Sequence, residues 1–271
     1  MSATAGHRRE LVTDDGVTLV WDEIGPPDGT PVVLCHGLGA SGLQFAADAD
    51  HFATLGCRVL VPDLRGHGRS GVPAVLAPGA FLLPRLAADL RHLLDAAGVG
   101  PVHWVGNSLG GIVALHMLEG GDRPRFRTLA TFGTSYSLRL PAFAGAAVPL
   151  LYRLFGARLI ARMTALSTSA DPAARRIIEQ MLRAFDPAVG RLVAEAVSRY
   201  DLIEPAAAAT DLPILLLRAR ADRGVNAALG PTLRRLSGLP HFRRRDIGGG
   251  HCANLDATAE VRSALEAHWS A

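Results

Sequence analysis

The sequence predicts an α/β protein with a mostly parallel, twisted sheet that is flanked by helices and interrupted by a helical insertion. Short apolar runs rich in β-branched residues alternate with longer segments of helical periodicity along most of the 271 residues. The alternation stops over residues 134–205, where only helical segments are predicted, and it resumes afterwards. A chain of this length can bury a full core in one large domain that carries an insertion.

The strands are predicted from their apolar content and from the turn residues at their ends. The first two form a hairpin, because Asp14, Asp15 and Gly16 between them make a turn sequence. The predicted strands are residues 9–12, 17–24, 32–35, 58–62, 102–105, 126–132, 213–217 and 241–247. The predicted helices outside the insertion are residues 41–55, 82–97, 112–118, 226–236 and 254–269.

Residues 134–205 are predicted to form a helical cap, so that the core domain consists of residues 1–133 and 206–271. Within the cap, Asp171 and Asp186 each precede a proline, and this pairing of an N-cap carboxylate with a first-turn proline predicts two helix starts.

The first part of the cap, residues 141–160, is unusually apolar for a surface element. Packing in a core would explain this composition, and so would an apolar wall above a ligand pocket. Phe143, Leu150 and Phe155 are therefore candidate substrate contacts.

Composition and charge exclude several kinds of function. The net charge is only +3 and the arginines are interspersed with acidic residues, which argues against a nucleic-acid partner. The sequence contains no lysine, which excludes Schiff-base chemistry and a Gly-Lys-Ser/Thr phosphate loop. Three cysteines without metal-like spacing favour free thiols and a cytoplasmic location. No apolar run approaches the roughly 20 residues that span a bilayer, so no membrane partner is expected.

Residues 106–110 read Gly-Asn-Ser-Leu-Gly, a Gly-x-Ser-x-Gly sequence between a predicted strand and a predicted helix. Such a turn holds Ser108 in a strained conformation at the strand end, where Gly106 and Gly110 leave room for it. The following helix points its N-terminus at Ser108, so the Leu109 N–H is a candidate oxyanion donor. The motif also occurs by chance in glycine-rich chains, and a serine nucleophile needs a base and a group that orients the base.

Asp222 and His251 are the candidates for those two groups. Like Ser108, each follows a predicted strand, and the carboxyl ends of parallel strands meet at one edge of a sheet. Taken singly, Asp222 could be a turn carboxylate and His251 is one of ten histidines. Their joint placement, in the order Ser, Asp, His, predicts a catalytic triad.

Two other motifs offer competing interpretations. Residues 37–42 fit Gly-x-Gly-x-x-Gly after a strand, with Asp63 where a ribose-binding acid would lie, as in NAD-type oxidoreductases. A hairpin precedes this motif, however, and the interpretation leaves Ser108 unexplained. Residues 63–70 could form a metal or phosphate site, but His67 has no partner at ligand spacing. We interpret that loop as one shaped by hydrogen bonds, and we expect no metal site.

Over nearly its whole length the chain resembles the α/β-hydrolase superfamily. His36-Gly37-Leu38-Gly39 looks like the oxyanion loop of that family. The resemblance implies that the Leu38 N–H is a second oxyanion donor and that His36 and Gly37 lie beside the substrate. Residues 63–70 look like the family's Asp-x-x-Gly-x-Gly-x-Ser loop, and residues 134–205 fall where its cap is inserted.

Different segments of the chain resemble different subfamilies. Residues 251–256, His-Cys-Ala-Asn-Leu-Asp, are similar to the segment around the catalytic histidine of 3-oxoadipate enol-lactonases. Residues 106–110 also look like the meta-cleavage C–C hydrolases, which usually carry Trp where this chain has Cys252. Dehalogenases and most epoxide hydrolases of this fold use an Asp nucleophile, and Ser108 argues against both.

The expected function is hydrolysis of a carboxylic ester or lactone of a small, largely apolar substrate, through an acyl-enzyme and without a metal or cofactor. C–C bond hydrolysis, perhydrolysis and a lyase reaction remain alternatives on the same triad. A non-catalytic ligand-binding protein with this fold is an alternative of another class. The sequence leaves open whether the chain forms a homodimer.

Overall fold

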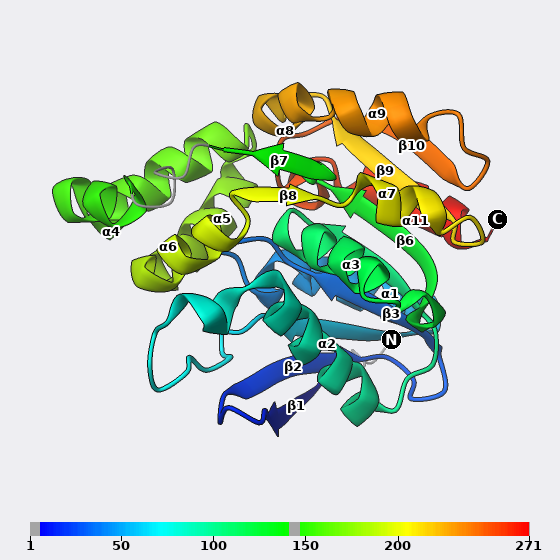
Figure 1. Ribbon diagram of the computed structural model, residues 1–271, viewed down its shortest axis with the longest axis horizontal. Coiled ribbons are helices and arrows are strands. Elements are labelled where there is room, and N and C mark those ends of the chain that lie inside the picture. Colours follow the sequence, from blue (N-terminus) through cyan, green and yellow to red (C-terminus); the bar gives the residue numbers. More distant parts are fainter. Residues whose placement is uncertain (1–5, 141–146, 271) are drawn as a thin grey trace.

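The computed structural model describes residues 6–140 and 147–270. Eight strands form one sheet in the spatial order β1-β2-β4-β3-β5-β6-β9-β10 (Figure 1). The pairs β1–β2 and β2–β4 are antiparallel and the remaining pairs are parallel, so the predicted fold class is confirmed. The strands are β1 (His7–Val12), β2 (Thr18–Ile24), β3 (Thr30–Cys35), β4 (Cys57–Asp63), β5 (Val102–Asn107), β6 (Phe126–Phe132), β9 (Ile214–Ala219) and β10 (Phe242–Ile247).

The strand order reverses at β3, because the chain passes from β3 to β4 on one side and returns to β5 on the other. In an open parallel sheet, the crevice beyond the carboxyl ends at such a reversal is where ligands bind. Cys35 of β3 pairs in register with Gly106 of β5. The loop after β3 therefore leaves the sheet directly beside Ser108.

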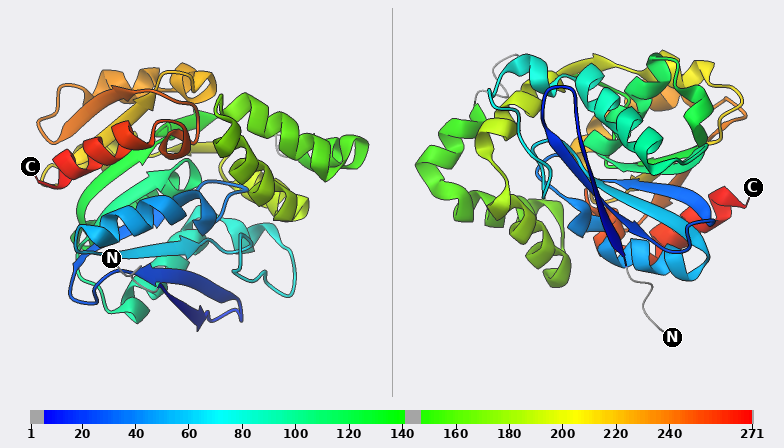
Figure 2. Two further views of the ribbon diagram at one scale, coloured as in Figure 1. Left: turned by 180° about the vertical axis from the view of Figure 1, so that it is seen from behind. Right: turned by 90° about the horizontal axis from the view of Figure 1, so that it is seen from below.

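Helices cover both faces of the sheet, and each face has its own apolar core (Figures 1 and 2). One layer contains α2 (Leu83–Ala97), α3 (Leu109–Glu119), α7 (Ile203–Ala208) and α9 (Gly230–Leu236). The opposite layer contains α1 (Ala46–Thr54) and α11 (Thr258–Trp269). Shorter helical turns are η1 (Gly42–Phe45), η2 (Pro78–Phe81), η3 (Arg123–Arg125), α8 (Arg223–Ala228) and α10 (Ala253–Asp256).

Between β6 and α7 the described chain forms β7 (Ser137–Arg139), α4 (Ala147–Thr168), α5 (Pro172–Ala184), α6 (Pro187–Ala196) and β8 (Arg199–Asp201). The two predicted helix starts are confirmed, because Asp171 accepts a hydrogen bond from Ala174 N–H and Asp186 accepts one from Ala188 N–H. We keep residues 134–205 as the proposed bounds of the cap.

The prediction that the cap contains no strand is wrong. β7 and β8 pair antiparallel over three residues each. An inserted segment must leave the sheet and return to nearly the same place, so its two ends run side by side and can pair. Strands of three residues are too short to show the alternation of polar and apolar residues by which strands are recognised.

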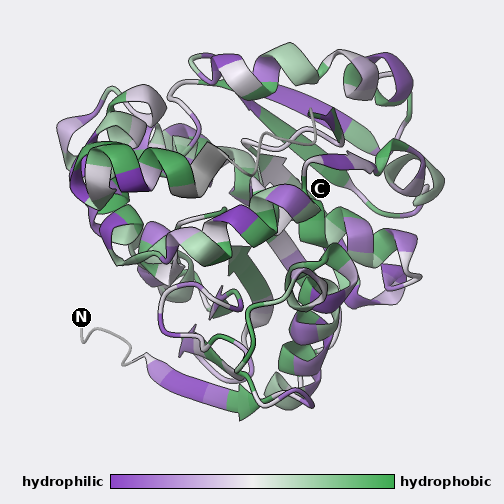
Figure 3. Cartoon of the chain, turned by 60° about the vertical axis from the view of Figure 1, so that its left-hand side comes forward, coloured by the Kyte–Doolittle hydropathy of each residue, from purple (hydrophilic) through white to green (hydrophobic). Residues whose placement is uncertain are grey.

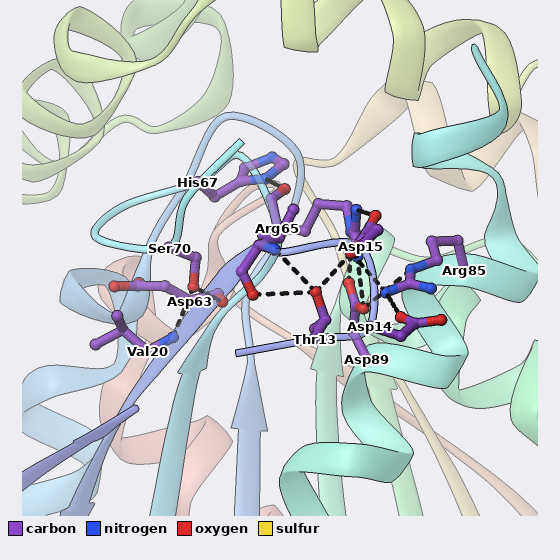
Figure 4. A network of polar contacts seen from close by, with 11 residues as sticks. Thr13, Asp14, Asp15, Val20, Asp63, Arg65, His67, Ser70, Arg85 and Asp89 are labelled. Carbon is purple, nitrogen blue, oxygen red and sulfur yellow. Dashed lines mark hydrogen bonds and ion pairs between the residues drawn. The ribbon is translucent and has the colours of Figure 1, made fainter. Parts of the chain in front are cut away.

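A buried ion network fixes the loop after β4 to the first hairpin (Figure 4). The Arg65 side chain is fully buried, with Nε 2.7 Å from Asp89 Oδ2 and Nη1 2.6 Å from Asp15 Oδ2. The hydrogen bond from Arg65 holds the pKa of the Asp15 carboxyl below its usual range.

The carboxylate of Asp63 is also occupied within this loop. It accepts hydrogen bonds from the Gly42 N–H at 2.7 Å and from Arg69 Nε at 2.8 Å. The Ser70 hydroxyl donates to the Asp63 carbonyl oxygen. Residues 63–70 thus form a loop shaped by hydrogen bonds, as we interpreted them, and both oxygens of the Asp63 carboxylate are engaged within the protein.

Candidate active site

Ser108 stands between the end of β5 and the start of α3, in a conformation that few side chains adopt. Its φ is 50° and its ψ is −113°, and it is the only residue other than glycine with positive φ among the described residues. A Cβ on Gly106 would lie 2.5 Å from Gly111 N, and one on Gly110 would lie 2.3 Å from the Cys35 carbonyl oxygen. The two glycines are therefore required by the close approach of strand, turn and helix.

Asp222 and His251 form the pair that the triad requires. His251 Nδ1 lies 2.8 Å from Asp222 Oδ2. The other carboxylate oxygen, Oδ1, accepts a hydrogen bond from Val225 N–H at the start of α8, which fixes the orientation of the carboxylate. Because the carboxylate can only accept, Nδ1 of His251 carries the hydrogen, and a neutral ring then has its lone pair on Nε2.

Ser108, Asp222 and His251 line a single cavity of about 320 Å³. Much of its remaining wall is apolar, with side chains from the core and from the base of the cap. The cap contributes Leu138, Val197 and Tyr200, with Thr134 and Ser135 at its first end, and no motif identifies these residues in the sequence. These residues all lie near the two ends of the insertion in the sequence, and that position could have predicted their place beside the cavity.

The two expected oxyanion donors lie beside Ser108. Leu38 and Leu109 both line the same cavity. Within the described residues neither N–H has a hydrogen-bond partner, as an anion-binding donor pair requires. Gly37 packs directly on the nucleophile turn, since a Cβ there would lie 3.1 Å from the Ser108 Cβ.

We expected His36 to lie beside the substrate, but the structure places its side chain away from the cavity that contains Ser108. The side chain is fully buried, and Nε2 accepts a hydrogen bond from the Leu64 N–H at 3.0 Å. Nδ1 donates to the Gly37 carbonyl oxygen at 2.8 Å, so both ring nitrogens are occupied. Burial lowers the pKa of His36, which keeps the ring neutral. His36 joins the loop after β3 to the loop after β4.

The predicted cap contacts need a similar correction. Phe143 lies outside the described residues. Leu150 and Phe155 are 55% and 52% exposed and do not line a cavity beside Ser108. Composition identified the apolar stretch but not which of its side chains face a pocket. That depends on how the helix is rotated about its axis, and the kink of α4 at Gly156 changes this rotation partway along the stretch.

Leu151, Tyr152 and Ile160 are the residues of this stretch that border the space beneath the cap, and Leu151 is also partly exposed. They line a second cavity of about 310 Å³, together with Leu182 and Phe185. Leu38 lines this cavity as well as the one that contains Ser108. The two spaces therefore adjoin at the oxyanion loop.

The sequence did not lead us to predict a buried polar network that adjoins Ser108 and His251. Asn107, the residue before Ser108, donates through Nδ2 to the His251 carbonyl oxygen at 2.9 Å. Its Oδ1 accepts a hydrogen bond from Gln44 Nε2, and Gln44 Nε2 also reaches Asn254 Oδ1. A polar residue at the end of a fully buried strand was the available signal.

The three cysteines are free thiols in the structure. Cys252 follows His251 directly, and burial raises the pKa of its thiol to about 12. A neutral, buried thiol is a poor nucleophile, so Cys252 does not compete with Ser108. In the described part of the chain, no group of three or more His, Cys, Asp and Glu side chains is arranged to hold a metal ion.

Comparison with known proteins decides the family. The family profile described as alpha/beta hydrolase fold matches residues 30–258, which include all three triad candidates. The chain belongs to the α/β-hydrolase family. The enol-lactonase from Burkholderia xenovorans has the same fold, with a TM-score of 0.82 at 19% identity, and the likeness covers 97% of this chain and 100% of that one. At this identity the likeness shows the fold alone.

Two relatives differ in how much of their length aligns with this chain. The magnesium-chelatase 30 kDa subunit of Rhodobacter capsulatus is 28% identical over 264 residues, which is 91% of this chain and 89% of that protein. Epoxide hydrolase A of Mycobacterium tuberculosis is 37% identical over 103 residues, 38% of this chain and 31% of its own length. The second likeness is therefore confined to part of the fold.

Proposed function

We propose that this α/β-hydrolase cleaves a carboxylic ester or lactone through an acyl-enzyme on Ser108. The observation that carries the proposal is the 2.8 Å hydrogen bond between His251 Nδ1 and Asp222 in a cavity that also contains Ser108. Asp222 holds the tautomer in which His251 Nε2 accepts a proton.

In the first half of the reaction the Ser108 hydroxyl oxygen attacks the acyl carbonyl carbon, and its proton passes to His251 Nε2. The negative charge on the carbonyl oxygen is stabilised by the N–H groups of Leu38 and Leu109. When the C–O bond to the alcohol breaks, His251 returns the proton to the leaving oxygen. In a lactone the leaving alcohol stays attached to the acyl chain.

In the second half, water attacks the acyl-enzyme and gives one proton to His251. The Ser108 oxygen then leaves the tetrahedral intermediate with that proton, and the carboxylic acid is released. The same two backbone donors stabilise the second intermediate, because the carbonyl oxygen occupies the same position.

The composition of the cavity supports a small, largely uncharged substrate. Its volume of about 320 Å³ lies at the lower end of the range for ligand sites. Apart from Asp222 and His251, no charged side chain lines it within the described residues. Structural neighbours named as an enol-lactonase and as esterases support the same substrate class. Ser108 distinguishes the chain from most epoxide hydrolases of this fold.

A panel of chromogenic esters, lactones and a ring-fission dienone tests the proposal, with Ser108→Ala as the control. We expect esters or lactones to be hydrolysed and Ser108→Ala to lose several orders of magnitude in turnover. Turnover of the dienone alone would assign C–C bond hydrolysis. Equal turnover by both proteins would overturn the role of Ser108.

A further inference from the structure

The outer surface of α4 is apolar, and within the described residues it stays exposed. Fifteen large hydrophobic side chains are exposed in the described part of the chain, and seven of them belong to this one helix. They are Leu150, Leu151, Leu154, Phe155, Leu159, Met163 and Leu166. Single exposed hydrophobic residues are normal on soluble monomers, whereas a concentration of them on one element marks an interaction site.

Both sides of α4 are apolar, but only one is packed. Ala161 and Ala165 are buried on the side that faces α5 and α6. Leu159, Met163 and Leu166 follow one another at intervals of four and three residues, and they form a second stripe on the outside. Figure 1 shows α4 extending from the edge of the molecule, and Figure 3 brings that side forward.

The charges on α4 are all positive. Arg153, Arg158 and Arg162 are exposed, and residues 123–170 contain no acidic residue. In the described cap the ion pairs lie within α5 and within α6, and they leave the three α4 arginines without a carboxylate. The occupant of this surface must therefore be apolar and must also supply negative charge.

A second copy of the chain meets only the first requirement. Two copies joined through α4 would bring six arginines together around an apolar contact, and like charges in that position repel. An anionic lipid surface meets both requirements, because its headgroups neutralise arginines while its acyl boundary takes up the apolar side chains.

We propose that α4 is an interfacial helix that docks the protein on an anionic lipid surface. No described helix is long and apolar enough to cross a membrane, so the helix would lie in the plane of the interface. From the sequence we expected no membrane partner, because no apolar segment is long enough to span a bilayer. Docking of α4 in the plane of the interface revises that expectation.

The position of α4 gives such docking a consequence for the enzyme, and this step rests on the proposed function. Leu151 is partly exposed on α4 and also lines the cavity of about 310 Å³ beneath the cap. That cavity adjoins the Ser108 cavity at Leu38. In this arrangement an apolar substrate dissolved in the lipid would enter through the cavity beneath the cap and pass Leu38 to reach Ser108.

Cosedimentation with lipid vesicles tests the docking separately from turnover. The full-length Ser108→Ala protein is mixed with vesicles of phosphatidylcholine alone or of phosphatidylcholine and phosphatidylglycerol in equal parts. We expect strong binding only to the second kind. Raising the salt from about 0.1 to about 1 M should weaken it, because the Debye length falls from about 10 to about 3 Å.

Matched variants locate the surface. Changing Arg153, Arg158 and Arg162 together to Gln should weaken binding by about two orders of magnitude. The control is the same triple change at Arg243, Arg244 and Arg245, which are exposed on β10 and alter net charge equally. The control should bind nearly as the parent does.

The apolar stripe has its own pair of variants. Changing Leu159, Met163 and Leu166 together to Ser should weaken binding by about tenfold or more. The control changes Val12, Leu55 and Val75 to Ser; these are exposed hydrophobic residues outside α4. Thermal melting of every variant checks that the fold is retained.

Three results would overturn the proposal. They are failure to bind the anionic vesicles, equal weakening by the α4 and control variants, and a dimer in light scattering that dissociates when the α4 stripe is changed. The last result would assign the surface to a second copy. If the protein binds the anionic vesicles but hydrolyses no ester or lactone, the proposed function is overturned and the docking proposal stands.

Discussion

The side chain of Asn107 donates a hydrogen bond to the backbone carbonyl oxygen of His251, with a distance of 2.9 Å between the two atoms. The residue directly before Ser108, the proposed nucleophile, thus holds the loop that carries His251, the proposed base. Gln44 fixes the Asn107 side chain from the other end through a bond of 3.1 Å to its Oδ1. The separation between Ser108 and His251 therefore depends on Asn107.

Replacing Asn107 with Ala should lower kcat by about 10- to 100-fold, because small displacements of a base cost that much. KM should change little, since Asn107 does not line the Ser108 cavity. Steady-state kinetics on one ester measures this split. A loss confined to protein stability, with kcat per folded molecule unchanged, would contradict a positioning role.

The strained backbone at Ser108 leads to a prediction about stability. Ser108→Gly should be more stable than Ser108→Ala by about 1 to 2 kcal/mol, because only glycine adopts a φ of 50° with this ψ freely. Both variants lack the nucleophile, so the comparison isolates the backbone. Urea unfolding measures the difference, and a more stable Ser108→Ala would show that the turn is not strained.

Much of the site was predictable because its motifs are local. Ser108, Asp222 and His251 each follow a strand, and strand ends share an edge in a parallel sheet. His36 could not be assigned in this way, because its burial depends on contact with Leu64, 28 residues away. The exposure of the Leu150 side chain depends on how α4 packs, and composition does not specify that packing.

The buried ring of His67 predicts a dependence of stability on pH. Burial is the largest cause that lowers its pKa, to about 3, with neighbouring His36 adding to the effect and Asp63 opposing it. The folded protein therefore binds fewer protons than the unfolded chain below the ordinary histidine pKa of 6.5. The stability contributed by neutral His67 is complete above that value and is lost as pH falls toward 3.

A comparison with His67→Phe tests this dependence. The variant keeps an aromatic ring against Phe185, where the ring centroids are 4.7 Å apart, and it loses the hydrogen bond to the Arg65 carbonyl oxygen. We expect the free energy of unfolding to fall less steeply in the variant between pH 6.5 and about 3. Parallel curves from urea titrations would contradict the assignment.

Leu138 and Val197 should determine the preference for apolar acyl groups. Truncating either to Ala should raise KM for an apolar ester by an amount equivalent to about 1 kcal/mol, with little change in kcat. A short, polar ester should be affected less. Leu150→Ala is the matched control, because Leu150 does not line the cavity. Equal effects of all three variants on both esters would contradict this division.

Covalent labelling with a fluorophosphonate, followed by peptide mass spectrometry, tests the proposed chemistry most directly. The reagent reacts with a serine only when a base and an oxyanion site activate it. We predict one adduct per chain, on Ser108, that is absent from Ser108→Ala and forms far more slowly in His251→Ala. Labelling at another residue, or labelling of Ser108→Ala at the wild-type rate, would contradict an acyl-enzyme on Ser108.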